Sequence, residues 1–167
     1  ATASLGRDGQ LDRLWRQSGL ASVTTFYSRV TERLGFTALR HEGKVTGLAA
    51  YVEPPEALVA HMSRRVHFDA PGFSTISSRK MDQAHDSFWG ELDKYSREEV
   101  AAAAQKVLED TIVPFVAHWI RHTDCGTVAV AGGVFANVKL NQRIAAIEGL
   151  KSLWVVPHMG DGGLAVG

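Results

Sequence analysis

The sequence predicts an α/β fold with a mixed sheet flanked by helices, and three observations in its last third support this prediction. Residues 127–133, TVAVAGG, have the pattern of a buried strand that ends in glycines, and residues 135–147 have the pattern of a helix. Residues 152–157, SLWVVP, are a second strand-like run, and the glycine-rich residues 160–167 follow it. This order is typical of a parallel sheet, because parallel strands need a crossover connection.

The N-terminal third predicts a hairpin followed by a helix. Short apolar stretches flank Asp8-Gly9, a strong turn signal, so two strands are expected in the first twenty residues. Residues 22–35 space apolar side chains four apart, with a serine in position to cap the start and a glycine to stop the end. This pattern predicts an amphipathic helix.

The middle of the chain predicts a less regular segment and then a long helix. Residues 54–94 show little periodicity apart from a second hairpin signal around Ala70-Pro71-Gly72. A capping box, SREE, begins at Ser96 and opens a long run of helically spaced apolar residues. Pro114 is expected to kink or split this helix, because proline removes one backbone hydrogen bond.

Composition limits the classes of protein to which the chain can belong. Its 167 residues suit one domain, and its formal net charge of zero argues against nucleic acid or an anionic membrane as partner. Its single cysteine excludes an internal disulfide and favours a reducing compartment. The absence of an apolar run of about 18 residues and of a secretory signal also indicates a cytoplasmic protein.

The chain is expected to be a piece of a longer protein. It opens without an initiator methionine, and its last glycine turn comes where another helix should begin. Contacts with further domains of the same chain are therefore expected.

Two glycine-rich turns carry the candidate ligand chemistry. Gly132 and Gly133 remove the β-carbon at a strand end, where the backbone and the next helix could approach a phosphate. Asp161, between Gly160 and Gly162, could reach a divalent metal or a metal-bound phosphate. The alternatives are a tight turn without ligand for the first pair and an N-cap role for Asp161.

Three motifs together resemble one family over nearly the whole chain. The chain is similar to the NodU/CmcH-type O-carbamoyltransferases in LGFTALRHEGKVTGLAAY (residues 34–51), AGGVFANVKLNQRI (131–144) and VVPHMGDGGLAVG (155–167). The last two motifs more distantly resemble the ATPase that makes threonylcarbamoyladenosine in tRNA and the carbamoyltransferase domain of hydrogenase maturation proteins. The resemblance implies an actin-like, ribonuclease H-like fold of the sugar kinase and heat-shock ATPase superfamily. Residues 1–167 would be its second portion, without the N-terminal half and without the domain that forms carbamoyl-adenylate.

The resemblance also implies the roles of the candidate site residues. AGGV would be the nucleotide loop, Asn137 would lie near the adenosine, and Asp161 would complete a metal site with two histidines upstream of residue 1. The expected cofactors are ATP and a divalent metal, iron or magnesium. The candidate cofactor-binding residues are Gly43, Gly132, Gly133, Val134, Asn137, Gly160 and Gly162, and the candidate metal ligand is Asp161.

HEGKVTGLAAY and a histidine beside the second glycine-rich turn supply the candidate catalytic residues. Lys44 offers a point charge for phosphate or carbamoyl oxygens, and Glu42 could orient a ribose hydroxyl or the acceptor. Gly43 and Gly47 would allow close approach, and His158, two residues before the second glycine turn, could line the site. Alternatively, Glu42 and Lys44 form a solvated pair on a turn.

His118 and His122 also have a metal-binding spacing. Their HxxxH pattern places both rings on one helix face. The family's metal histidines precede the residues present here, and histidines near a helix C-terminus interact favourably with its dipole. We therefore expect a structural role for this pair.

The complete enzyme implied by the resemblance uses carbamoyl phosphate and ATP to make carbamoyl-adenylate. It then transfers the carbamoyl group to a hydroxyl of a sugar or natural-product acceptor. The alternatives are the threonylcarbamoyl-transfer ATPase acting on tRNA and a nucleotide-binding module without chemistry.

Overall fold

The computed structural model of the chain describes residues 1–18, 22–75 and 87–159. Within these ranges the helices are α1 (Val23–Arg33), α2 (Glu42–Leu48), α3 (Glu56–Ser63), α5 (Ser87–Leu92), α6 (Arg97–Thr123), the 3-10 helix η1 (Gly133–Ala136) and α7 (Val138–Ala145). The strands are β1 (Thr2–Arg7), β2 (Gln10–Arg16), β3 (Val66–Asp69), β4 (Gly72–Thr75), β5 (Thr127–Val130) and β6 (Ser152–Val155). The described part is thus an α/β structure, as the sequence predicts. Its strands form three separate two-stranded sheets, β1–β2, β3–β4 and β5–β6, and not the one mixed sheet that was expected.

Helix α6 is the platform on which the other elements pack. The Ser96 side chain accepts the Glu99 N–H at 3.2 Å, and the Glu99 carboxylate accepts the Ser96 N–H at 2.8 Å, which confirms the capping box. Pro114 was expected to kink or split this helix. The helix continues through it, so the split is wrong. Ile112 and Val116 are buried on either side of the proline, and their tertiary packing holds the helix across the missing hydrogen bond.

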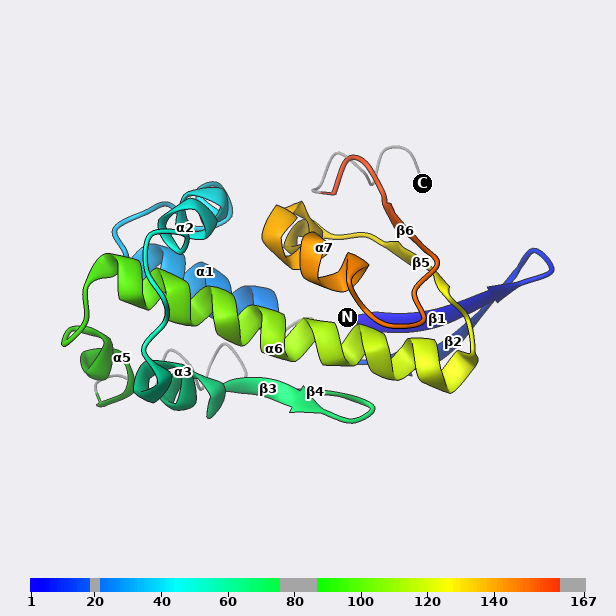
Figure 1. The fold of residues 1–167 in the computed structure, drawn as a ribbon, viewed down its shortest axis with the longest axis horizontal. Coiled ribbons are helices and arrows are strands. Elements are labelled where there is room, and N and C mark those ends of the chain that lie inside the picture. The colour runs from blue at the N-terminus through cyan, green and yellow to red at the C-terminus, as the bar shows by residue number, and fades with distance from the viewer. Residues whose placement is uncertain (19–21, 76–86, 160–167) are drawn as a thin grey trace.

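The core lies on two sides of α6. Figure 1 shows α1, α2 and α7 on one side of this helix, and α3 with the β3–β4 hairpin on the other. Small side chains in the first half of α6 let the neighbouring helices approach closely, and the partners fill the space with fully buried side chains. These buried residues are Ala101, Ala103, Ala104, Val107 and Leu108 of α6, Phe26 and Val30 of α1, Val45 of α2, Leu58 and Met62 of α3, and Leu140 and Ile144 of α7.

Both predicted hairpins and the first predicted helix are confirmed. Strands β1 and β2 pair antiparallel through Asp8 and Gly9, which both adopt positive φ, and β3 pairs antiparallel with β4. Helix α1 begins after Ser22, whose hydroxyl accepts the Thr24 N–H. The segment predicted to be irregular contains α3 and α5 as well. Both short helices form because they bury apolar side chains in the core, not because of a strong local pattern.

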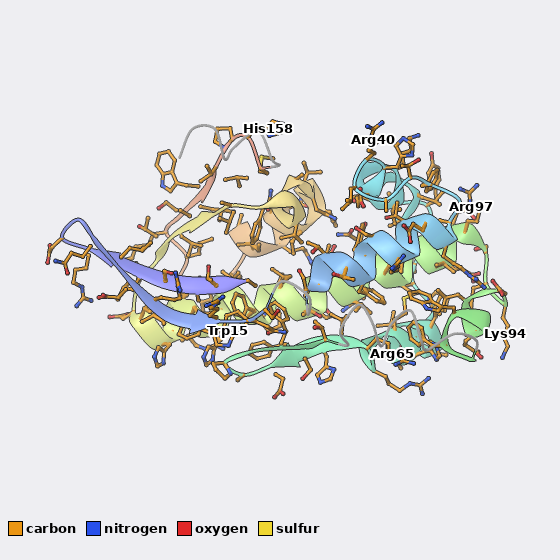
Figure 2. The ribbon with its side chains drawn as sticks, turned by 180° about the vertical axis from the view of Figure 1, so that it is seen from behind. Trp15, Arg40, Arg65, Lys94, Arg97 and His158 are labelled. Atoms are coloured by element: carbon orange, nitrogen blue, oxygen red, sulfur yellow. The ribbon has the colours of Figure 1, made fainter. Side chains whose placement is uncertain are left out.

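An aromatic cluster joins the two hairpins to α6. The Trp15 ring lies 5.5 Å from the Phe73 ring and 5.1 Å from the Phe115 ring, centroid to centroid, and Figure 2 shows Trp15 beside β3–β4. Gly72 fits beneath this tryptophan, because a β-carbon there would lie 2.3 Å from an indole carbon. The glycine at the second hairpin is therefore required by close packing.

We expect Gly72→Ala to destabilise the protein by about 1–3 kcal/mol, because the added methyl group overpacks a rigid ring. Urea denaturation followed by tryptophan fluorescence measures the change. Gly90→Ala is the matched control, because a β-carbon at Gly90 meets no atom within 4 Å and the site is helical. Equal stability of Gly72→Ala and wild type would contradict this account of the cluster.

Strands β5 and β6 form the predicted parallel pair, with Val130 opposite Val155. The helix predicted for residues 135–147 starts later than expected. Gly133–Ala136 form a 3-10 turn, and α7 begins only after Asn137, whose side chain accepts the Leu140 N–H at 2.9 Å. A good N-cap residue thus overrides the apolar periodicity of the preceding residues. The helices in the described ranges include none long and apolar enough to cross a bilayer.

Candidate functional site

The carboxyl ends of β5 and β6 leave the sheet at the same edge. Val130 and Val155 are register partners, and the Val156 N–H donates to the Val130 carbonyl at 3.0 Å. Gly132 follows β5 by two residues, and His158 follows β6 by three. The segments that lead into both glycine-rich turns therefore start side by side, which is where parallel sheets bind ligands.

The first turn presents open backbone. Gly132 has φ 107° and ψ 156°, a conformation that glycine alone adopts without strain, so its identity follows from the backbone. Gly133 lies outside the positive-φ region, and a β-carbon there would meet no atom within 4 Å. Both glycines are exposed. Nothing in the described structure requires glycine at position 133. A glycine that the fold does not need is expected where a ligand approaches the backbone closely.

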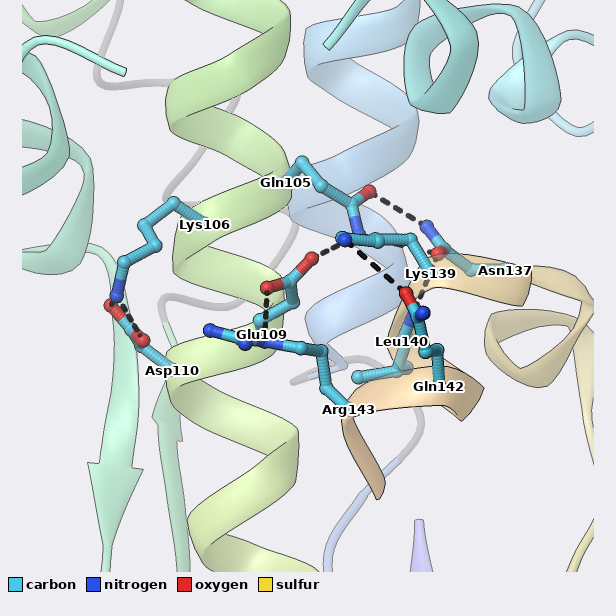
Figure 3. Close-up of polar contacts among 9 residues, drawn as sticks. All are labelled: Gln105, Lys106, Glu109, Asp110, Asn137, Lys139, Leu140, Gln142 and Arg143. Atoms are coloured by element: carbon cyan, nitrogen blue, oxygen red, sulfur yellow. Dashed lines mark hydrogen bonds and ion pairs between the residues drawn. The ribbon is translucent and has the colours of Figure 1, made fainter. Parts of the chain in front are cut away.

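Asn137 ties this turn to the rest of the protein. Its side-chain nitrogen donates to Thr46 Oγ1 at 3.1 Å. The same nitrogen donates to Gln105 Oε1 at 2.8 Å, and the side-chain oxygen accepts from Gln105 Nε2 at 3.2 Å (Figure 3). Thr46 belongs to α2, inside HEGKVTGLAAY. The two sequence motifs, 91 residues apart, therefore meet through a direct hydrogen bond.

A buried polar network surrounds this contact. Gln105 is 6% exposed, accepts the Tyr27 hydroxyl at 3.0 Å and donates to Glu109 at 2.9 Å. Glu109 is 7% exposed and pairs with Arg143 of α7 at 3.2 Å. These residues were not among the candidates predicted from the sequence, although the sequence contains one signal for them. Gln105 and Glu109 are polar residues four apart in the otherwise apolar face of α6.

Burial raises the pKa of Tyr27 to about 12, and the nearby carboxylates of Glu42 and Glu109 act in the same direction. The folded protein keeps this proton between pH 10 and 12, whereas the unfolded chain loses it. The contribution of Tyr27 to the free energy of unfolding is therefore fully present below pH 10. It falls by about 2–3 kcal/mol as pH rises toward 12. Thermal unfolding against pH should show this loss in wild type and a smaller loss in Tyr27→Phe. The exposed Tyr51 gives a control variant, Tyr51→Phe, that should behave as wild type.

Helix α2 holds the other candidate residues. The Glu42 carboxylate accepts the Ser28 hydroxyl at 2.9 Å and the Leu39 N–H at 2.7 Å, so it stabilises the loop that enters the helix. The alternative of a solvated Glu42–Lys44 pair on a turn is not what the structure shows, since both residues are helical and make no ion pair with each other.

Lys44 remains available to an anion. Its ammonium lies 5.7 Å from the Phe36 ring centroid and has no carboxylate partner in the described ranges, and the Arg97 guanidinium lies 4.9 Å from the same ring. Gly43 and Gly47 are exposed and helical, with open space at each β-carbon position. The expected close approach at these glycines involves no described part of the chain.

Comparison with known proteins agrees with these motifs. The model of the family described as Carbamoyltransferase N-terminus matches residues 4–167. The chain belongs to this family. It is 34% identical over 160 residues to the uncharacterized protein MJ1058 of Methanocaldococcus jannaschii, covering 88% of this chain and 25% of that protein.

Two further relatives show the same partial coverage. The uncharacterized protein MJ1051 of Methanocaldococcus jannaschii is 27% identical over 172 residues, which cover 99% of this chain and 33% of that protein. The uncharacterized protein sll1178 of Synechocystis sp. is 28% identical over 184 residues, covering all of this chain and 30% of that protein. The chain thus spans between a quarter and a third of the length of these relatives.

Of the remaining candidate residues of this carbamoyltransferase-family chain, two are described by the structure and three are not. Figure 2 shows His158 and Arg40 on the side of the molecule that carries α2, α7 and the end of β6, and His158 is exposed. Val134 is half-buried within η1. Gly160, Asp161 and Gly162 lie outside the described residues.

The described residues do not assemble a metal site. No group of three or more histidine, cysteine, aspartate or glutamate side chains within residues 1–18, 22–75 and 87–159 could hold an ion. His118 and His122 stack with ring centroids 5.9 Å apart, and both lie about 5 Å from the Trp119 ring, at 5.2 and 5.3 Å. These histidines therefore form part of an aromatic cluster at the end of α6.

Proposed function

We propose that this chain is the part of an O-carbamoyltransferase that binds nucleotide between its Gly132–Gly133 turn and α2. The observation that carries the proposal is the 3.1 Å hydrogen bond from Asn137 to Thr46, which brings the two motifs of a carbamoyltransferase-family protein together. Open backbone at Gly133 suits polyphosphate recognition, and so does the Lys44 ammonium, which has no carboxylate partner among the described residues. We also propose that the described α/β structure belongs to an actin-like ATPase domain.

The proposed reaction transfers a carbamoyl group from carbamoyl-adenylate to an acceptor hydroxyl. Carbamoyl-adenylate would first be made from carbamoyl phosphate and ATP, with release of inorganic phosphate and pyrophosphate. The hydroxyl oxygen attacks the carbamoyl carbon, the bond from that carbon to the phosphate oxygen breaks, and AMP leaves with the electron pair. His158, exposed at the same sheet edge, is our candidate to take the hydroxyl proton. Lys44 would hold the phosphate oxygens and stabilise the leaving AMP.

A divalent metal, iron or magnesium, remains part of the proposal through Asp161 alone. The described residues offer no ligand set for it, so the other ligands would have to come from elsewhere in the full-length protein. We therefore derive no step of the transfer through the metal.

The full-length protein, incubated with ATP, carbamoyl phosphate and a panel of hydroxylated acceptors, tests the proposed function. We expect release of inorganic phosphate, pyrophosphate and AMP, and a mass increase of one carbamoyl group in one acceptor class. An arm with unmodified tRNA and L-threonine tests the threonylcarbamoyl alternative. Nucleotide binding without any product in either arm would instead support a module without chemistry, and would overturn the proposal.

A further inference from the structure

Gln105, which is buried, and Asn137, which is half-buried, form an amide pair at the meeting point of α2, α6 and α7. Each side chain donates to the other, at 2.8 and 3.2 Å, so the two amides are held by a closed pair of hydrogen bonds. Asn137 therefore stabilises the contact with α6 and also caps the start of α7.

The amide of Asn137 is saturated by the protein. Its nitrogen uses both hydrogens, on Thr46 and Gln105, and its oxygen accepts from the Leu140 N–H and from Gln105. An asparagine amide has two donors and two principal acceptor positions, so none is left for a ligand. The adenosine contact expected at Asn137 is therefore not available to its amide in this arrangement.

The carboxylate of Glu109 fixes the orientation of the Gln105 and Asn137 amides. Glu109, held by Arg143 at 3.2 Å, can only accept, so Gln105 must turn its nitrogen toward it at 2.9 Å. The Gln105 oxygen then faces Tyr27 and the nitrogen of Asn137, which in turn faces Thr46. Glu109 therefore determines which way the Gln105 amide faces. The Gln105 amide in turn determines how the Asn137 amide faces Thr46 of α2.

We infer that Gln105 is a positioning residue, which sets the separation between the Gly132–Gly133 turn and α2 by acting through Asn137. This inference rests on the proposed function. Gln105 itself is buried against Tyr27, Asn137 and Glu109, so it acts without touching the nucleotide. A misplacement of about 1 Å between parts of a site can cost 10²-fold in rate, which is why such a residue matters to catalysis.

Gln105→Met in the full-length enzyme removes the two hydrogen bonds to Asn137, together with those to Tyr27 and Glu109, while keeping the length of the side chain. We expect kcat/KM for ATP to fall by about tenfold or more, with a raised KM, at temperatures where circular dichroism shows the variant folded. A purely structural role would lower only the active fraction, and hence kcat, without changing KM. Asp110→Asn, an exposed carboxylate-to-amide change on the same helix, is the matched control and should behave as wild type.

Gln105→Glu adds a readout that loss of packing alone would not give. The new carboxylate still accepts from Tyr27 and Asn137, but it lies against the carboxylate of Glu109. Only at low pH, when the two carboxylates share a proton, does residue 105 again donate a hydrogen bond to Glu109. We expect its KM for ATP to approach the wild-type value as pH falls, while the wild-type KM shows no such recovery. A pH-independent KM in Gln105→Glu would overturn the inference.

A crystal structure of Gln105→Met gives a test that needs no activity. The inference predicts that the Asn137–Thr46 hydrogen bond is lost and that the Gly132–Gly133 turn moves relative to α2. If the turn keeps its place, the inference is wrong, whatever the fate of the proposed function. If the wild-type enzyme instead makes no carbamoylated product, the proposed function fails, and this structure still decides whether Gln105 positions the turn.

Discussion

Gly133→Ala is expected to lower carbamoyl transfer by the full-length enzyme about 100-fold while leaving its melting temperature unchanged or slightly higher. The free protein has room for the methyl group, since no atom lies within 4 Å of the β-carbon position and the residue is in a 3-10 turn. Only a ligand close to the backbone would meet it, and displacing a phosphate by about 1 Å can cost 10²-fold in rate. Steady-state kinetics and differential scanning calorimetry on the same preparation measure both quantities.

Gly132→Ala is the informative contrast to Gly133→Ala. Gly132 needs its φ of 107°, so alanine there strains the backbone with or without a ligand, and both stability and activity should fall. Gly90→Ala, on open space in α5, should leave activity unchanged and stability unchanged or slightly higher. Wild-type activity in Gly133→Ala would show that no ligand approaches this backbone.

Asp161→Asn is expected to reduce carbamoyl transfer by about 10²-fold or more. This substitution separates the two roles that the sequence allows for Asp161. Asparagine caps a helix as well as aspartate does, so an N-cap role predicts a nearly silent change. A role in holding a metal or a metal-bound phosphate requires the charge, and loss of a ligand costs at least the 10- to 100-fold typical of supporting residues.

Asp161→Ala completes the comparison. If Asp161 is only a cap, alanine should cost about 1 kcal/mol of stability and little activity. If it is a ligand, alanine and asparagine should be equally inactive, and metal content measured on the purified full-length variants should fall with activity. Full activity of Asp161→Asn would remove this residue from the proposed site.

Local signals in the sequence predicted much of the fold. Asp8-Gly9, the Ser96 capping box and the serine before α1 each carry their own hydrogen bonds or backbone preference, and the structure confirms all three. The parallel pairing of β5 and β6 was also predictable, because only a crossover helix connects such strands over this distance. These features depend on neighbouring residues, so a single sequence shows them.

The features that depend on tertiary packing could not be predicted in the same way. Helix α2 contains two glycines and buries Val45 as its one fully enclosed apolar side chain, so its helical state comes from packing on α6. Pro114 similarly remains inside α6 against its local preference. The sequence pointed to Asn137 as a ligand contact, but its network with Gln105 and Thr46 appears only when three helices are placed together.

The central claim is that the Gly132–Gly133 turn and α2 bind one nucleotide between them. A crystal structure of the full-length protein with a non-hydrolysable ATP analogue tests this most directly. We expect phosphate oxygens within hydrogen-bonding distance of the Gly133 N–H, with the Lys44 ammonium turned toward the same phosphates. A nucleotide bound elsewhere, with Gly133 and Lys44 both in solvent, would contradict the account.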